Sequence, residues 1–212
     1  NNQLTAMFNY AVKYYNLHEN PCTKAGSMGK SHAEEMNFWT KAEFEQFIVA
    51  VQDKPASYTA FMTLYYTGMR VGELCALTPA DVNLVDHTIT INKTFQCING
   101  RDVIWPPKMP KSNRVVTIPQ ILANCLKEYM DKCYEIQLDD RLFPYTNSFL
   151  NHEMLRGCKK SGVKKIRVHD LRHSHASLLI EMGCQPLLIA DRLGHEKIQT
   201  TLNTYSHLRS EE

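Results

Sequence analysis

The sequence lacks any apolar run long enough to cross a membrane. A spanning helix needs about 18 or more consecutive apolar residues, and the 212 residues contain no such run. The first four residues, Asn1-Asn2-Gln3-Leu4, also lack the basic segment followed by an apolar one that marks a secretory signal. No methionine begins the chain, so we expect a piece of a longer protein. With 43% hydrophobic residues, it has enough apolar side chains for a core.

Paired cysteines are also lacking. None of the seven cysteines forms a Cys-x-x-Cys pair, and they stand apart at Cys22, Cys75, Cys97, Cys125, Cys133, Cys158 and Cys184. An odd, dispersed set is typical of reduced thiols in a cytosolic protein. The pattern therefore predicts neither a disulfide framework nor a zinc site.

A strong excess of one charge is missing as well, since the formal net charge is only +2. Global charge therefore indicates nucleic-acid binding only weakly. One segment differs: residues 156–167 contain no acid but carry Arg156, Lys159, Lys160, Lys164, Lys165 and Arg167. Such a segment suits a phosphate backbone, but a solvated basic loop explains it equally well.

The first part of the chain is set apart by a polar segment. Residues 2–17 place apolar side chains three and four positions apart, which predicts an amphipathic helix. Residues 23–36 are polar and rich in small residues, as a linker is. We therefore expect residues 1–22 to be the end of an upstream domain and residues 37–212 to form a domain of their own.

The second domain is predicted to be mainly helical. The expected helices cover about 41–53, 57–67, 70–78, 119–136, 147–161, 170–182, 186–193 and 197–204. Thr40, with Glu43 three residues later, forms a capping box for the first of these. Alternating residues predict strands over 88–95, 101–105 and 114–118, with a hairpin turn at Asn99-Gly100. The pattern indicates a mostly α, α+β domain in which helices pack around one small antiparallel sheet.

Arg70 stands in an unusual place. In the run Thr67-Gly68-Met69-Arg70-Val71-Gly72-Glu73-Leu74, a helix that ends at a glycine is followed at once by an arginine that begins another. A helix N-terminus favours negative charge, so this arginine suits a site where it and the helix end both bind an anion such as phosphate. An ordinary surface arginine beside a structural turn is the alternative.

A second group combines histidines with an arginine, in the run His169-Asp170-Leu171-Arg172-His173-Ser174-His175. Positions i and i+3 share a helix face, so His169 and Arg172 could contact the same ligand atom. Three histidines in this run also suggest a metal. However, no cysteine or carboxylate completes a ligand set, and Arg172 would repel a cation. We therefore expect no metal.

Two further residues are ordinary when taken alone. His195 follows Gly194, a glycine typical of a helix C-terminus. Tyr205 is one of ten tyrosines, and a lone tyrosine is normally a core or rim residue. Their spacing distinguishes them, because Tyr205 follows His195 by ten residues and Arg172 by thirty-three.

Together these residues resemble the active-site signature of the tyrosine recombinases, the phage-integrase-like enzymes. The likeness extends over about residues 37–208 and includes the blocks TGMRVGEL, HDLRHSHAS and LGH…TLNTY. The integrases of phages and conjugative transposons of Gram-positive bacteria are the most similar members. The resemblance implies the catalytic-domain fold of this family. It also makes residues 1–22 the C-terminal helix of an upstream DNA-binding, or core-binding, domain.

The family cleaves one DNA strand at a time without metal, ATP or another cofactor. A tyrosine hydroxyl attacks the scissile phosphate, a 3′-phosphotyrosine forms and a 5′-hydroxyl leaves. The reverse attack rejoins the strands, which is covalent catalysis. The resemblance makes Tyr205 the nucleophile and assigns Arg70 and Arg172 to the negative charge on the phosphate.

Proton transfer and orientation need further groups. The resemblance assigns His169 to the proton of the tyrosine and His195 to a hydrogen bond with the phosphate. Glu73, one helical turn after Arg70, is expected either to orient a neighbour in the site or to form a plain surface salt bridge.

The leaving oxygen takes its proton from a lysine of a β-hairpin in this family. Relatives commonly have Pro-Lys-Thr followed by a serine and an arginine, and that register selects Lys108, with Arg114 six residues later. Met109 replaces the threonine and Pro110 intrudes, so Lys111 remains a rival. The basic residues expected to contact backbone phosphates, or only solvent, are Lys111, Arg114, Arg101, Lys164, Lys165 and Arg167.

The resemblance also implies partners. They are double-stranded DNA, further copies of the full-length protein in a homotetramer on DNA, and an excisionase or DNA-bending accessory protein. The implied reaction is integration or excision of a mobile element in the bacterial cytoplasm. Type IB topoisomerases use a similar residue set, so strand cleavage that relaxes supercoils is the nearest alternative. A non-catalytic DNA-binding module is the other.

Overall fold

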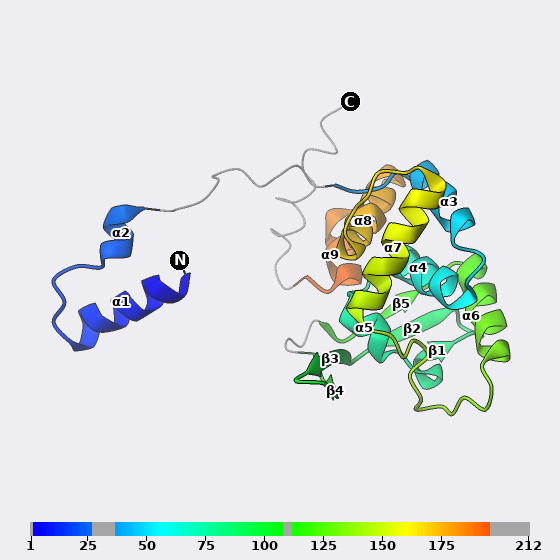
Figure 1. Cartoon of the computed structure of the whole chain (residues 1–212), viewed down its shortest axis with the longest axis horizontal. Helices are drawn as coiled ribbons and strands as arrows, with labels where there is room; N and C mark the ends of the chain where they lie inside the picture. Colours follow the sequence, from blue (N-terminus) through cyan, green and yellow to red (C-terminus); the bar gives the residue numbers. More distant parts are fainter. Residues whose placement is uncertain (1, 27–36, 108–111, 196–212) are drawn as a thin grey trace. The chain divides into compact units, whose positions relative to one another are not determined.

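The structure, a computed structural model, describes residues 2–26, 37–107 and 112–195. The chain divides into two compact units, Asn1–Met36 and Asn37–Glu212, and each is treated by itself. Figure 1 shows that the larger unit combines helices with short strands, as the sequence predicts.

The described part of the smaller unit contains the helices α1 (Asn2–Tyr14) and α2 (Pro21–Ala25). Asn20 joins them, because its side chain bonds to α1 and also accepts the backbone N–H of Cys22 at 2.8 Å. The sequence predicts a helix over 2–17 and then a linker, whereas α1 stops earlier and a proline begins α2. Proline is well tolerated at the first position of a helix. That this unit ends an upstream DNA-binding domain stays a prediction.

The larger unit carries most of the secondary structure. Its described helices are α3 (Lys41–Ala50), α4 (Pro55–Thr67), α5 (Val71–Ala76), α6 (Gln120–Lys132), α7 (Asn147–Ser161), α8 (Leu171–Glu181) and α9 (Pro186–Leu193). Its described strands are β1 (Val82–Asn83), β2 (Thr88–Ile91), β3 (Thr94–Ile98), β4 (Arg101–Trp105) and β5 (Arg114–Thr117). The helix predicted over 197–204 lies outside the described residues. The mostly α, α+β fold class is confirmed.

The described strands form two small antiparallel sheets instead of the single sheet expected. β2 lies between β1 and β5 in one sheet, and β3 pairs with β4 in the other. The prediction of one strand over 88–95 is wrong, because the chain breaks at Asn92-Lys93. Lys93 stands where the alternation calls for a buried apolar residue. Its ammonium is instead bound by Asp81 at 2.7 Å and by Thr78 at 3.0 Å.

The turn between β3 and β4 agrees with its prediction. Ile98 pairs with Arg101, so Asn99 and Gly100 form a two-residue loop. Both have positive φ angles, 51° and 75°, as a type I′ hairpin turn requires. The hairpin turn at Asn99-Gly100 is therefore confirmed.

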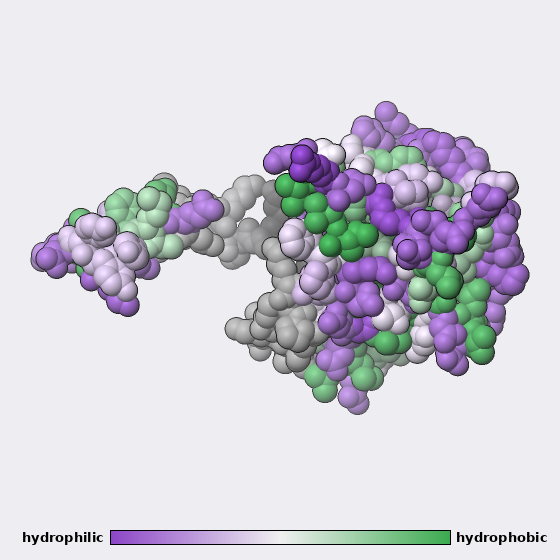
Figure 2. All heavy atoms as spheres, turned by 90° about the horizontal axis from the view of Figure 1, so that it is seen from below, coloured by the Kyte–Doolittle hydropathy of each residue, from purple (hydrophilic) through white to green (hydrophobic). Residues whose placement is uncertain are grey.

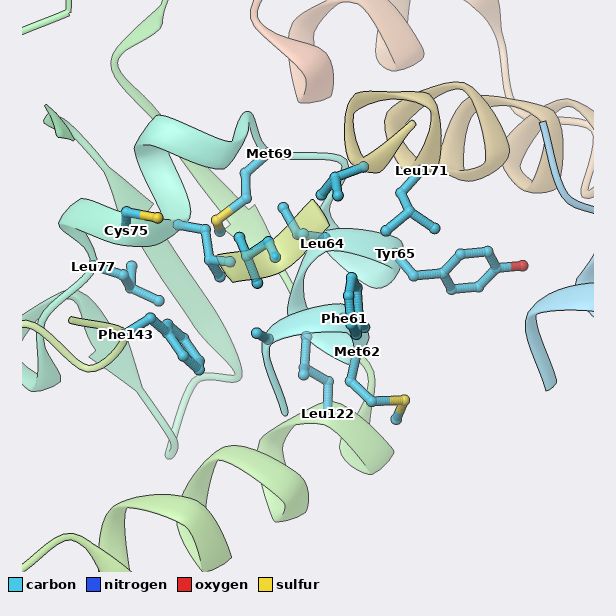
Figure 3. Close-up of a cluster of buried hydrophobic side chains, with 14 of the residues drawn as sticks. Phe61, Met62, Leu64, Tyr65, Met69, Cys75, Leu77, Leu122, Phe143 and Leu171 are labelled. Carbon is cyan, nitrogen blue, oxygen red and sulfur yellow. The ribbon is translucent and has the colours of Figure 1, made fainter. Parts of the chain in front are cut away.

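The core is built around α4, which is buried on nearly every side. A helix that is apolar all round belongs inside a protein, and α4 contacts both α6 and α8. Figure 3 shows Phe61, Leu64 and Tyr65 of α4 among side chains from neighbouring elements, including Leu122 and Leu171. This packing fixes α4 and also the turn at its C-terminal end, where the candidate site begins.

Local signals and one close contact hold α3 on this core. Oγ1 of Thr40 accepts the N–H of Glu43 at 3.3 Å, and Oε2 of Glu43 accepts the N–H of Thr40 at 2.8 Å. The predicted capping box is thus confirmed. α3 packs on α7 at Gly157, where a Cβ would lie 2.3 Å from Cε2 of Phe47. Only a glycine permits this approach of the two helices.

The surface of the larger unit is mixed in character. On the face shown in Figure 2, hydrophilic side chains surround separate apolar patches. Exposed apolar residues such as Val85, Val115 and Ile121 are scattered over several elements, which is normal for a folded surface. No described helix is long and apolar enough to span a membrane.

Candidate active site

The turn after α4 carries the chain to Arg70. Gly68 ends α4 in the left-handed conformation, with a φ of 64°, which glycine adopts without steric cost. A Cβ at this position would lie 2.6 Å from Cδ2 of His175 and 2.7 Å from Cδ2 of Leu193. Only a glycine therefore lets this turn approach α8 and α9 so closely.

Arg70 and Arg114 share the carboxylate of Glu73. Oε1 accepts from Nη1 of Arg70 at 2.9 Å and from Nη1 of Arg114 at 3.2 Å. Oε2 accepts from the backbone N–H of Arg70 and from Nη2 of Arg114, both at 2.8 Å. Only 4% of the Glu73 side chain is exposed. A plain surface salt bridge, one of the two interpretations of Glu73, is therefore excluded.

The electrostatics of Glu73 follow from this geometry. Burial alone would raise the pKa of its carboxyl group. The hydrogen bonds and charge of Arg114, together with the backbone N–H and charge of Arg70, outweigh burial and hold the pKa below its ordinary value. Glu73 is thus a buried anion that orients Arg70.

The start of α5 differs from the expectation in one respect. The sequence suggests that the helix end and Arg70 both address an anion. The backbone N–H of Arg70 instead donates to Glu73, so a carboxylate of the chain itself takes that donor. The side chain of Arg70 remains 41% exposed, and its guanidinium is therefore accessible to a ligand.

The guanidinium of Arg114 already forms hydrogen bonds within the protein. Its Nε donates to the carbonyl of Arg192 at 2.8 Å and its Nη1 to the carbonyl of Ser112 at 3.1 Å, in addition to the contacts with Glu73. Its side chain is only 6% exposed. The predicted contact with a backbone phosphate would require the guanidinium to leave these partners. In this geometry Arg114 instead joins the start of β5 to α5 and to the last turn of α9.

Arg172 lies at the start of α8 and is 4% exposed. Its Nη1 donates to the carbonyl of Gly68 at 2.8 Å, and its Nη2 donates to the carbonyl of Leu193 at 2.5 Å. The first acceptor lies in the turn that precedes Arg70, and the second lies two residues before His195. Arg172 therefore connects the segments that carry the other candidate residues.

His169 lies in a 3₁₀ turn, Val168–Asp170, that leads into α8. Its ring meets the ring of His173 edge-on, with 5.8 Å between the ring centroids. The side chain of His169 reaches solvent, but partial desolvation and then the charge of Arg172 lower its pKa. Desolvation and then the charge of His169 lower the pKa of His173. Both rings are therefore mainly neutral at pH 7. The ring contact places His173 beside His169 in the site, although the sequence assigns no catalytic role to His173.

His195 follows α9 and belongs to the same group. Desolvation, then the charges of Arg172 and Arg70, lower the pKa of His195 to about 4. The hydrogen bonds of Arg172 hold this group together, because one acceptor, the carbonyl of Leu193, is two residues before His195 and the other, the carbonyl of Gly68, is two residues before Arg70. The imidazole of His195 is neutral at pH 7 and carries one N–H donor.

His175 has a different place from its neighbours in the sequence. It is 2% exposed, and its Nε2 accepts a hydrogen bond from Nε of Arg192 at 2.9 Å. An acceptor nitrogen requires the neutral ring with its proton on Nδ1, and desolvation lowers the pKa of His175 to about 3. His175 is thus a core residue. Within the described ranges, no three His, Cys, Asp or Glu side chains form a candidate metal cluster.

Two predicted catalytic residues, Lys108 and Tyr205, lie outside the described part of the chain, as does Lys111, the rival of Lys108. Lys108 and Lys111 lie between β4 and β5, and Tyr205 follows α9. The structure thus brings together the arginines and histidines of the predicted site, Arg70, His169, Arg172 and His195. The lysine and the tyrosine stay predictions.

Four of the basic residues expected to contact DNA lie on the surface, whereas Lys111 is outside the described residues. Arg101 on β4 and Lys165 after α7 are exposed. Lys164 pairs with Glu43 at 3.4 Å, and Arg167 pairs with an aspartate of its own turn at 2.7 Å. DNA contacts of these side chains also stay predictions.

Comparison with known proteins assigns the chain to a family. The sequence model of the phage integrase family matches residues 37–212. The chain belongs to this family. The family predicted from the signature residues is therefore confirmed.

Two curated integrases resemble most of the chain. The ICEBs1 integrase of Bacillus subtilis (strain 168) is 31% identical, over 97% of this chain and 59% of that protein. The integrase of Staphylococcus phage L54a is 30% identical, over 94% of this chain and 66% of that protein. The chain therefore spans only 59–66% of the length of these relatives.

Solved structures share the fold. The Tn1549 transposon integrase in complex with circular intermediate DNA aligns with a TM-score of 0.80 and 21% identity, over 95% of this chain and 72% of that chain. A lambda integrase dimer bound to a COC′ core site aligns with a TM-score of 0.64 and 19% identity, over 93% of this chain and 70% of that chain. These matches confirm the predicted tyrosine-recombinase catalytic-domain fold.

Proposed function

We propose that the protein is a site-specific DNA recombinase, an integrase that cleaves and rejoins DNA strands through a 3′-phosphotyrosine intermediate. The observation that carries the proposal is the convergence of Arg70, Arg172, His169 and His195 from three separate segments of the chain. The names of its relatives, integrases of ICEBs1 and of phage L54a, support integration and excision of a mobile element as the biological reaction.

The two arginines suit the charge that develops on the phosphate. The transition state concentrates negative charge on the non-bridging oxygens, and a guanidinium stays positive and offers planar pairs of donors. Arg172 is fixed by two backbone carbonyls and Arg70 by Glu73. Each donor held in place before the reaction is worth about 2.7–4 kcal/mol of transition-state stabilisation.

The two histidines suit the transfer of a proton and the binding of an oxygen. A tyrosine hydroxyl has a pKa near 10 in water, so Tyr205 needs a proton acceptor. His169 is neutral at pH 7 because desolvation and Arg172 lower its pKa, and it can therefore take that proton. The N–H of neutral His195 can bind a non-bridging oxygen. The Tyr205 oxygen then bonds to phosphorus as the bond from phosphorus to O5′ breaks.

The departing O5′ takes a proton from a lysine, for which we favour Lys108 over Lys111. In the joining step a 5′-hydroxyl of the partner strand attacks the phosphotyrosine and gives its proton to the lysine. The oxygen of Tyr205 leaves and takes a proton back from His169. One phosphate ester bond forms for each that breaks. The cycle therefore needs neither ATP nor another cofactor.

Double-stranded DNA is the proposed substrate. The Tn1549 and lambda integrases, whose fold this chain shares, were solved on DNA. We extend DNA binding to this chain. For the full-length protein we propose a homotetramer on DNA, an excisionase or DNA-bending partner, and action in the bacterial cytoplasm.

A nicked DNA duplex tests the proposal. The duplex carries an end of the element that encodes the chain, and its nick lets the leaving fragment diffuse away, which traps the covalent complex. Wild-type protein should form a complex that resists SDS. Tyr205→Phe should bind the same DNA without forming it, and Tyr134→Phe, at an 88% exposed side chain, should match wild type. Absence of the complex with wild-type protein would contradict the proposal.

A second measurement separates a recombinase from its nearest alternative. Two duplexes of different length, each with an element end, are incubated with the full-length protein. A recombinase exchanges strands between them and yields products of new length. Relaxation of a supercoiled plasmid with no exchanged product would instead indicate topoisomerase-like cleavage.

A further inference from the structure

The backbone at the end of α9 makes a regular terminating turn. A helix leaves its last four carbonyls without partners inside the helix. The N–H of His195 donates to the carbonyl of Ala190 at 2.9 Å, and the N–H of Gly194 donates to that of Asp191 at 3.0 Å. With Gly194 in the left-handed conformation, this is the Schellman arrangement. It satisfies two of the four carbonyls.

Side chains of the site satisfy the other two. Nε of Arg114 donates to the carbonyl of Arg192, and Nη2 of Arg172 donates to the carbonyl of Leu193. Both arginines also bond to the segment around Arg70, one through Glu73 and the other through the turn after α4. The end of α9 is therefore tied to the arginine side of the site.

The side chain of Arg192 adds a second set of bonds. Its Nε donates to Nε2 of His175 at 2.9 Å, and its Nη1 donates to Oγ1 of Thr117 at 3.2 Å. Its Nη2 donates to the carbonyls of Tyr66 at 2.9 Å and of Thr117 at 2.8 Å. One planar guanidinium thus bonds to α8, β5 and α4. A lysine ammonium donates from one nitrogen only and could not reach all of these acceptors.

Each of these three elements leads directly to a residue of the site. α4 ends three residues before Arg70, α8 contains Arg172 in its first turn, and β5 begins at Arg114. Arg192 itself lies three residues before His195. A shift of Arg192 would therefore move His195 relative to all of them.

We propose that Arg192 is a positioning residue, which holds the end of α9 so that His195 keeps its place beside Arg70 and Arg172. The role of Arg192 in the reaction rests on the proposed recombinase function. Its role in the geometry rests on the four hydrogen bonds of its guanidinium. Arg192 acts through His195 and does not itself contact DNA.

The first test needs no DNA. NMR of the histidine rings in the whole chain measures the pKa of each imidazole, and His195→Gln identifies the signal of His195. In Arg192→Met and Arg192→Lys, His195 should gain water and lose its close approach to the arginines. Its pKa should therefore rise from about 4 toward the ordinary 6.5.

Two features make this test specific. Arg192→Lys keeps the positive charge, so a rise in both variants excludes loss of charge as the cause. Arg141→Met removes a partly buried guanidinium that lies over the ring of Phe95 and near Asp102, and it should leave His195 unchanged. If the Arg192 variants do not fold, the pKa of His195 is measured in Thr117→Val, which removes only the hydroxyl that accepts from Nη1 of Arg192. An unchanged pKa of His195 in the folded variants would overturn the proposal.

The second test measures the rate of covalent capture on the nicked duplex. Arg192→Lys should slow capture about tenfold in the wild-type background and less than about threefold when His195 is already alanine, because residues that act together are not additive. DNA affinity, measured by gel shift, should stay the same. An equal slowing in both backgrounds would overturn the positioning role.

The two tests distinguish the two proposals. If wild-type protein captures no DNA, the recombinase function fails, and the NMR result still decides whether Arg192 positions His195. If wild-type protein captures DNA but the pKa of His195 does not move in the variants, the inference about Arg192 fails and the function stands.

Discussion

Replacement of Glu73 by glutamine should weaken the fold and the site together. Four donors from Arg70 and Arg114 meet at the two oxygens of Glu73. Glutamine has nearly the same shape but only one acceptor oxygen, and its amide NH₂ would face two donors. Glu73→Gln therefore loses two of the four hydrogen bonds and leaves two guanidinium groups without their counter-charge.

The magnitude follows from burial. Removal of one partner of a buried ion pair costs about 3–5 kcal/mol. The side chain of Arg114 is 6% exposed and has little access to water, whereas that of Arg70 is 41% exposed and is partly screened. We therefore expect a loss at the lower end, about 3 kcal/mol. In a chain of this size that lowers Tm by about 6–12 °C.

The loss should depend on pH in a defined direction. The pKa of Glu73 is lower in the folded state than its unfolded value of 4.5. Its ionised form therefore stabilises the fold fully above pH 4.5, and this contribution declines as the pH falls through the folded-state pKa. The glutamine variant has no such contribution. The difference between wild type and variant should thus be constant near neutral pH and shrink in acid.

Urea unfolding at a series of pH values measures this difference. Glu45→Gln is the matched control, because Glu45 forms an exposed pair with Lys41 at 3.8 Å, and such pairs contribute little. A Glu73→Gln variant as stable as wild type at pH 7 would refute the reasoning. So would a large difference that stays unchanged down to pH 3.

Three other substitutions test further parts of the account. Gly68→Ala should lower Tm by about 2–8 °C from the left-handed backbone alone, and an unchanged Tm in thermal unfolding would contradict the close packing of this turn. A 5′-thiol leaving group departs without a proton, so it should restore cleavage to Lys108→Ala but not to Lys111→Ala; the opposite result would make Lys111 the general acid. Arg114→Met should slow capture without weakening DNA binding, whereas a reduction of the salt slope of binding by about one would indicate a phosphate contact.

Local rules predict the parts of the fold that neighbouring residues determine. The capping box of Thr40 and Glu43 requires only residues three apart. The turn at Asn99-Gly100 requires only two residues that tolerate positive φ. Gly68 is marked as a helix end by its place after an apolar helix. Each of these features depends on residues only a few positions apart, so it can be predicted directly from the sequence.

The break between β2 and β3 shows what alternation leaves out. Ile89, Ile91 and Phe95 are all buried at even spacing, so the pattern continues through the break. Lys93 falls in the same register, but its ammonium forms an ion pair with Asp81, which lies twelve residues earlier. Such a distant ion pair has no signal in the periodicity.

The candidate site divides in the same way. The order of Arg70, His169, Arg172 and His195 is a family signature and can be read from the sequence. The contacts of Glu73 with Arg114, 41 residues later, and of Arg192 with Tyr66, 126 residues earlier, depend on the packing of separate elements. The sequence names Glu73 and Arg114, but their contact with each other and the contacts of Arg192 emerge only from the structure.

The peptide that carries the DNA tests the central claim most directly. After capture on the nicked duplex, nuclease and protease digestion leaves one peptide with a nucleotide attached through its 3′-phosphate, and tandem mass spectrometry locates the modified residue. The account predicts the adduct on the hydroxyl oxygen of Tyr205. An adduct on any other residue, or a wild-type protein that binds the duplex and yields no adduct, would contradict it.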